Sequence, residues 1–143
     1  MRLKQYIVNE LFDTDVLINT SMKRYDKHLY RFGIDGLQYR FDAIFDEDEG
    51  WQIFFGIEKG KKMDVSITNT GNQNKVFAAV LKCLKIFLNK VKPDRIFFTA
   101  KEPSRQKLYD RMSKLLTKMF PYKIDRQDIH RFDKSKFYGF TRS

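Results

Sequence analysis

Residues 68–77, TNTGNQNKVF, combine the groups that proteins use to hold a phosphate. If a helix begins after Gly71, its first N–H groups are unpaired and lie at the positive end of the helix dipole, which favours an anion. Gly71 would let a ligand approach the backbone closely, and Lys75 adds a positive charge. The candidate cofactor-binding residues are therefore Gly71, Asn72, Gln73, Asn74, Lys75 and Val76.

A capping role is the alternative for this turn. Thr70, Asn72 or Asn74 could simply cap the helix, because these residue types are preferred at that position. The stretch contains neither a Walker A pattern nor GxGxxG, so the phosphate prediction depends on a single glycine.

Two further residues have the chemistry of acid–base catalysts. Tyr109 lies in a helical pattern, and its hydroxyl, with an ordinary pKa of about 10, is a candidate acid that protonates a leaving group. Glu58 ends the run WQIFFGIE and is the candidate general base for an amine, with Asp64 as its alternative. The structural interpretation is that the Tyr109 ring is buried with its hydroxyl in water, and that both carboxylates lie at the surface.

The elements that would position these residues begin with a meander of strands. The aromatic and β-branched runs LYRFGI, LQYRFDAIF and WQIFFGIE are separated by turn residues at Asp35-Gly36 and Asp46–Gly50. We expect the acidic run in the second turn to be a solvated hairpin tip rather than a metal site. Before the meander, the pattern predicts a helix over residues 1–12 and then a loop or short helix with Val16–Ile18 buried.

The second half of the chain has the helical period. Apolar residues predict a long helix from Val76 to Val91, which Pro93 ends, and then a strand, RIFFTA, covered on both faces. Pro103 suits the start of a second helix. The inward stripe predicted for that helix consists of Leu108, Met112, Leu115 and Met119. Strands are predicted from Tyr122 and in FYGFTR.

The predicted fold class is therefore α/β, with an α+β mixed sheet. An antiparallel meander precedes a βαβα unit, formed by VSITNT, the long helix, RIFFTA and the second helix, and C-terminal strands follow. We expect one domain over residues 1–143.

This order of elements resembles the GNAT (general control-related N-acetyltransferase) superfamily. The segment EPSRQKLYDRM is similar to the family's second motif, in which an Asn and a small residue precede a Leu-Tyr pair; Glu102 and Arg105 stand at those two positions here. TGNQNKV stands where the family has its pyrophosphate loop, with Val76 in place of the first glycine. The composition also resembles that of small uncharacterised bacteriophage proteins.

The resemblance implies a cofactor and a mechanism. Acetyl-CoA would bind in the splay between the VSITNT and RIFFTA strands, and an amine would attack it directly. Tyr109 would protonate the departing coenzyme A thiolate. The GNAT-like fold would extend over the single domain.

Composition narrows the class of protein. A chain of 143 residues with 42% hydrophobic and 15% aromatic residues is typical of a folded globular domain. We expect no membrane-spanning helix and no signal peptide, and the lone Cys83 fits a reducing cytoplasm, the host cytoplasm if the protein is viral. His28 and His130 are far apart in the sequence, so no metal site is predicted.

Three functions are compatible with the charge of the second half of the chain. Residues 71–143 carry eighteen basic and six acidic side chains, which favours an anionic partner or a solvated lysine-rich surface. The preferred hypothesis is a binding protein for a host or virion component, with Trp51, Phe54 and Phe55 as exposed anchors. The first alternative is an acetyl-CoA-dependent N-acyltransferase. The second is nucleic-acid binding through residues 126–142, where basic and aromatic residues alternate.

Overall fold

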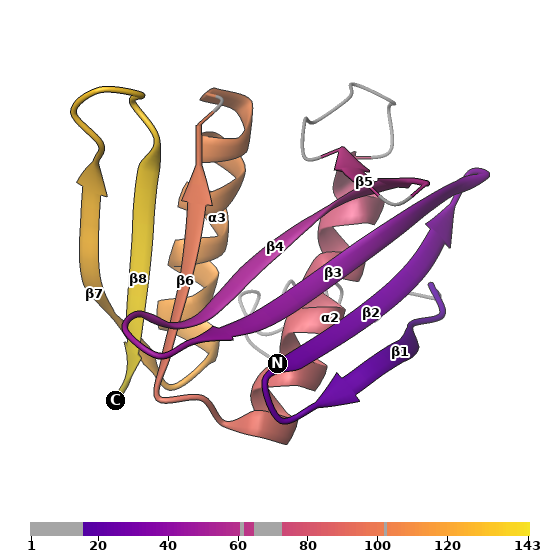
Figure 1. Ribbon diagram of the computed structural model, residues 1–143, viewed down its shortest axis with the longest axis horizontal. Helices are drawn as coiled ribbons and strands as arrows, with labels where there is room; N and C mark the ends of the chain where they lie inside the picture. Colours follow the sequence, from indigo (N-terminus) through magenta and orange to yellow (C-terminus); the bar gives the residue numbers. More distant parts are fainter. Residues whose placement is uncertain (1–15, 61, 65–72, 102) are drawn as a thin grey trace, which may run out of the picture. The chain divides into compact units, whose positions relative to one another are not determined.

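A computed structural model describes residues 16–60, 62–64, 73–101 and 103–143 of the chain. Within these residues the protein is a mixed α+β structure with two helices and a mixed sheet (Figure 1). The strand order in the sheet is β1-β2-β3-β4-β6-β8-β7, and β5 pairs with β4 beside this path. The elements are β1 (Asn19–Arg24), β2 (Lys27–Ile34), β3 (Leu37–Asp46), β4 (Gly50–Lys59), β5 (Lys62–Asp64), α2 (Gln73–Val91), β6 (Arg95–Ala100), α3 (Pro103–Met119), β7 (Tyr122–Ile129) and β8 (Lys136–Arg142).

The chain divides into two compact units, and we describe each by itself. Unit 1 comprises Met1–Asp42 and Phe55–Lys92, and unit 2 comprises Ala43–Phe54 and Pro93–Ser143. Strands β3 and β4 each contribute residues to both units. That residues 1–143 form one domain stays a prediction. The predicted helix over residues 1–12 and the predicted strand VSITNT lie outside the described residues.

In unit 1, helix α2 packs its apolar stripe into the core, as the helical period predicts. The buried members of the stripe are Phe77, Val80, Leu81, Leu84, Phe87 and Leu88. The ring of His28 on β2 lies 5.5 Å from the ring of Phe87, and burial raises the pKa of the Cys83 thiol to about 12. The helix ends as predicted, because Lys92 adopts a left-handed φ of 51° and Pro93 follows.

Strand β1 corrects the prediction for the residues before the meander. Asn19–Arg24 is a strand paired antiparallel with β2, not a loop or helix, and Leu17 is 82% exposed although Val16 is buried. The sequence NTSMKR offers no alternation of apolar and polar residues, because five of its six residues are exposed. Backbone pairing with β2, the next strand along the chain, therefore stabilises this strand, and a strand that buries so few side chains leaves no periodic signal.

Unit 2 is built around β6. This strand pairs in parallel with β4, at Trp51–Ile96 and Gln52–Phe97, and antiparallel with β8 along its whole length. Consecutive burial of Ile96, Phe97 and Phe98 confirms that RIFFTA is covered on both faces. Strand β7 pairs with β8 and ends the strand order, and α3 contacts β6, β7 and β8 (Figure 1).

The inward face of α3 differs from the predicted stripe. The buried residues of α3 are Arg105, Tyr109, Met112, Ser113 and Leu116, whereas Leu108, Leu115 and Met119 are only half-buried. A count of apolar residues misses this face because two of its members, Arg105 and Ser113, are polar. Ser113 is accommodated since its hydroxyl donates to the Tyr109 carbonyl at 2.8 Å.

The hairpin tip between β3 and β4 is solvated, as predicted. Asp46 Oδ1 accepts hydrogen bonds from the N–H groups of Asp48 and Glu49 at 2.8 and 3.0 Å. Gly50 then has a φ of 98°, and a Cβ at this position would lie 2.5 Å from the Arg95 carbonyl oxygen. A glycine is therefore needed where β4 begins beside β6.

Candidate functional site

The described part of the predicted cofactor turn is the first turn of α2. Gly71 and Asn72 lie outside the described residues, and α2 begins at Gln73. Asn74 and Lys75 are exposed, and Val76 is half-buried. The helix N-terminus thus occurs where the sequence predicts it.

Lys75 also lines a hollow of about 400 Å³ in unit 1. The other lining residues are Val16, Leu17, Asn19, Phe32, Gly33, Ile34, Asp35 and Gln38. Lys75 and Asp35 are the charged groups of this lining, and the rest is apolar or amide. The hollow can therefore offer one cation and several hydrogen-bonding groups to a ligand.

Tyr109, the predicted acid, lies in the core of unit 2. Its side chain is 2% exposed, its ring stacks on Phe98 at 5.0 Å, and its edge meets Tyr138 at 5.8 Å. Burial raises the pKa of Tyr109, although the Arg105 guanidinium opposes this rise by hydrogen bonding to the hydroxyl. A phenol whose pKa is raised by burial is a weaker proton donor than an exposed tyrosine, so this environment favours a structural role.

Glu58, the predicted base, is held by two arginines in unit 1. Arg31 donates from Nε and Nη2 to the two carboxylate oxygens at 2.9 and 3.0 Å, and Arg40 Nη1 lies 3.7 Å from Oε1. Arg40 also pairs with Asp42 at 3.0 Å. The hydrogen bonds from Arg31 lower the pKa of Glu58, which makes it a weaker base than an ordinary carboxylate. Glu58 and Tyr109 belong to different units.

The Glu58 ion pair gives a pH-dependent contribution to stability. Because its pKa is lower in the folded protein, this contribution is present above the ordinary value of 4.5 and is lost as the pH falls below it. We expect Glu58→Gln to be less stable than the wild type at pH 7, with a difference that shrinks below pH 4.5. Urea unfolding followed by circular dichroism between pH 7 and 3 measures this difference.

Asp42 supplies a matched control with the opposite sign. Its side chain is 2% exposed, and burial raises its pKa despite the Arg40 pair. A raised pKa favours the folded state at low pH, so the wild type should lose stability relative to Asp42→Asn as the pH rises through 3.8 and above. Because the two assignments predict opposite signs, parallel pH profiles for the two variants would contradict one of them, and the sign of the shared profile would show which.

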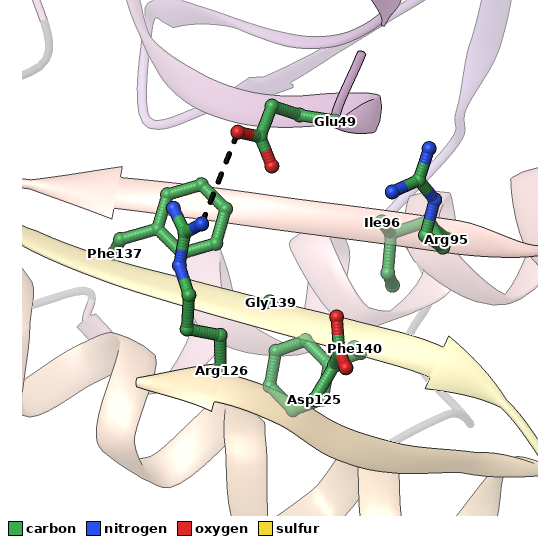
Figure 2. Close-up of a pocket in the computed structure, with 8 residues that line it drawn as sticks. All are labelled: Glu49, Arg95, Ile96, Asp125, Arg126, Phe137, Gly139 and Phe140. Carbon is green, nitrogen blue, oxygen red and sulfur yellow. Dashed lines mark ion pairs between the residues drawn. The ribbon is translucent and has the colours of Figure 1, made fainter. Parts of the chain in front are cut away.

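A small charged hollow lies in unit 2, over the sheet face opposite α3. It has a volume of about 20 Å³, roughly one water molecule, and Gly139 lies among its lining residues (Figure 2). The Arg126 guanidinium lies 4.0 Å from the centre of the Phe137 ring, and Phe137 stacks on Phe97 at 5.2 Å. Figure 2 shows the Arg126 guanidinium in front of this ring, with Glu49 3.9 Å away.

This hollow carries balanced charge. Arg95 and Arg126 are its cations, and Glu49 and Asp125 are its carboxylates. Arg126 also pairs with Asp128 at 3.0 Å. A site of this size and balance can fix a charged side chain or a water, but it has no room for a cofactor.

Strand β7 is the most exposed element of unit 2. Seven of its eight residues are exposed, and it is hydrogen-bonded to β8 at one edge of the described sheet. Ile124 and Ile129, which pair with Phe140 and Lys136, are 52% and 62% exposed, and Phe132 in the following turn is 84% exposed. The register shifts between Ile124 and Arg126, which places a bulge in this strand.

The apolar residues that are exposed to a partner differ from those that the sequence predicts. Trp51 and Phe55 are 7% and 3% exposed, and Phe54 is half-buried, so the prediction that they are exposed anchors is wrong. Their strand β4 lies in the middle of the strand order, between β3 and β6, so it is not an edge strand of the described sheet. Ile124, Ile129 and Phe132 are exposed instead. The sequence has no clear signal for them, because Ile124 and Ile129 are five positions apart and only the bulge places them on one face of β7.

The segment predicted to bind nucleic acid, residues 126–142, forms most of β7, a turn and β8. Several of its cations are already paired. Lys136 lies 3.1 Å from Asp110, and Arg142 lies 3.4 Å from Asp94. Among its aromatic residues, Tyr138 and Phe140 are buried. Residues 126–134 of the segment are exposed, so the buried and paired groups lie mainly in β8.

Residues 16–60, 62–64, 73–101 and 103–143 contain no group of three or more histidine, cysteine, aspartate or glutamate side chains placed to hold a metal ion. Neither of the two helices in these ranges has the length and apolar character needed to cross a membrane.

Residues 43–141 match the model of DUF6934, a family of unknown function. The chain belongs to the DUF6934 family. The match includes all of the described unit 2 except its last two residues, together with β5 and α2 of unit 1. A comparison of this DUF6934 protein with curated proteins found no match.

Proposed function

We propose that this chain is a GNAT-like domain that binds a protein partner through strand β7, the partner being a host or virion component if the protein is viral. The order of the described elements supports the GNAT-like part. Strands β2, β3 and β4 are followed by α2, β6, α3, β7 and β8, and β4 and β6 are parallel. The resemblance implies this order, with the strand VSITNT, which lies outside the described residues, directly before α2.

The exposed edge of β7 carries the proposal. An unpaired strand edge is a template for an added strand, and its main-chain groups supply hydrogen bonds while alternate side chains supply specificity. Ile124 and Ile129 lie on one face of β7, whereas Lys123, Arg126 and Asp128 lie on the other. The fitting partner is an extended segment whose apolar residues alternate with charged ones.

The charges and the bulge of β7 give selectivity. Natural edge strands use charged residues and bulges to prevent indiscriminate pairing. Arg126 turns over β8, where its guanidinium contacts the Phe137 ring and pairs with Glu49 and Asp128. An acidic residue of the partner would instead meet Lys123, an exposed cation of β7.

The alternative function is acetyl-CoA-dependent N-acyltransfer. Lys75 at the start of α2, beside the hollow in unit 1, is the observation that favours it. Burial of Tyr109 and the Arg31 pair of Glu58 favour binding over catalysis, because neither group is set up to exchange a proton.

Thermal unfolding with coenzyme A ligands distinguishes the two functions. Under the binding proposal, acetyl-CoA and coenzyme A leave the melting temperature unchanged. A ligand at a hundred times its dissociation constant stabilises the folded state by about 2.7 kcal/mol, which is several degrees for a protein of this size. A rise of that order would overturn the proposal in favour of the transferase.

Capture with matched variants tests the β7 surface. The double variant Ile124→Lys and Ile129→Lys should lose at least about tenfold in binding to a captured bacterial protein, since it places charges where apolar contacts are expected. Tyr25→Lys is the control, because Tyr25 is 89% exposed in unit 1. Equal capture by the double variant and the wild type would contradict the proposed surface.

A further inference from the structure

Helix α3 presents a row of cations on its outer face. Lys107, Arg111, Lys114 and Lys118 are all exposed, and their spacings of four, three and four residues bring them to one side of the helix. At 100° per residue they fall within about 60° of arc and extend over about 16 Å. We call these four residues the basic ridge. The buried residues of α3, centred on Tyr109 and Leu116, lie on the opposite side of the helix.

The acidic residue of α3 does not neutralise the basic ridge. Asp110 is the one acidic residue in the described sequence Pro103–Met119. Its Oδ1 is bound by Lys136 Nζ at 3.1 Å and by the Tyr138 hydroxyl at 2.9 Å, both from β8. Among the described residues, the ion pairs that the structure contains include none of Lys107, Lys114 and Lys118.

The chemistry of the basic ridge identifies its partner. We propose that it binds the phosphate backbone of a nucleic acid, independently of base sequence. A membrane-surface helix needs apolar residues beside its cations, but none of the large exposed apolar side chains of the described residues belongs to α3. A protein interface needs aromatic or apolar anchors, which the ridge also lacks. A polyphosphate requires only regularly placed cations.

This surface differs from residues 126–142 and from the β7 edge. It consists of one helix face, whereas the cations of β8 are held by Asp110 and Asp94. The proposal is therefore independent of the proposed protein-binding function, and either can fail without the other.

Salt-dependent binding to DNA tests the basic ridge. The probe is a fluorescein-labelled 20-base-pair duplex of arbitrary sequence, followed by anisotropy. Four phosphate contacts give a slope of log K against log salt of about −3.6, or about a 150-fold loss of affinity between 50 and 200 mM salt. The triple variant Lys107→Gln, Lys114→Gln and Lys118→Gln should bind more weakly, with a slope of about −0.9 and only about a threefold to fourfold loss over this range.

Three comparisons decide the outcome. The control Lys23→Gln, Lys85→Gln and Lys90→Gln removes the same charge from exposed positions of unit 1 and should keep the wild-type slope. Circular dichroism verifies that both triple variants fold. Failure of the wild type to bind the duplex at 50 mM salt, or equal loss in both triple variants, would overturn the proposal. Tighter binding to phosphatidylserine vesicles or to polyglutamate than to the duplex would also overturn it.

Discussion

Replacing Tyr109 with alanine is expected to lower the free energy of unfolding by about 3–5 kcal/mol, the usual cost of truncating a buried aromatic side chain. The ring is 2% exposed and lies between Phe98 and Tyr138, so its removal leaves a cavity bounded by aromatic faces. Trp51 is the single tryptophan of the chain and lies in unit 2. Urea unfolding followed by Trp51 fluorescence therefore measures this loss directly.

A second Tyr109 variant separates the ring from the hydroxyl. Tyr109→Phe keeps the stacked contacts and loses the hydrogen bond from Arg105, which should cost about 1–3 kcal/mol because a charged donor is involved. Tyr25→Ala, at an exposed position in unit 1, should change stability by less than about 0.5 kcal/mol. A Tyr109→Ala variant as stable as Tyr25→Ala would show that the ring is not part of the core.

Gly50→Ala is expected to lower the free energy of unfolding by about 2–6 kcal/mol, the sum of a strained φ and a steric overlap. The new Cβ would lie 2.5 Å from the Arg95 carbonyl oxygen and 2.9 Å from its carbonyl carbon. Both atoms belong to the backbone of β6, which cannot move without disturbing its pairing with β8. Circular dichroism is the suitable measurement, since Gly50 adjoins Trp51.

Gly60→Ala isolates the overlap from the strain. Gly60 has a φ of 61°, and a Cβ there would meet nothing within 4 Å. This variant should therefore lose only the conformational part, about 1–2 kcal/mol. A Gly50→Ala variant that is no less stable than Gly60→Ala would mean that β6 can shift away from residue 50.

Elements with a periodic pattern could be predicted from the sequence, and elements without one could not. The α2 stripe and the apolar run of β6 could be predicted, because buried positions on a helix or strand are filled by apolar residues at a fixed spacing. Strand β1 has no such spacing, since its stability comes from pairing with β2. The α3 face is misassigned because Arg105, Tyr109 and Ser113 are buried through specific contacts that a hydrophobicity pattern does not contain.

In the candidate site, too, only the features that follow from a periodic pattern could be predicted from the sequence. The sequence correctly places a helix start beside Lys75, because the apolar stripe that follows defines α2. It cannot show that Arg31 binds Glu58, since these residues lie 27 positions apart on strands β2 and β4. Nor can it show which aromatic residues are exposed, because Trp51 lies in a central strand and Phe132 in a turn, and these places rather than their chemistry set their burial.

Unit 2 is made of two separate segments of the chain, and this determines when its sheet can form during folding. Trp51 and Ile96 pair across about 45 intervening positions. The chain must therefore lose the conformational entropy of this loop before the contact can stabilise the structure. Helix α2, with 19 residues and only local hydrogen bonds, lies within that loop. When it forms, it shortens the loop and lowers the entropy still to be lost. Closure of β4 against β6 should therefore be a late, rate-limiting event, and α2 stability should control its speed.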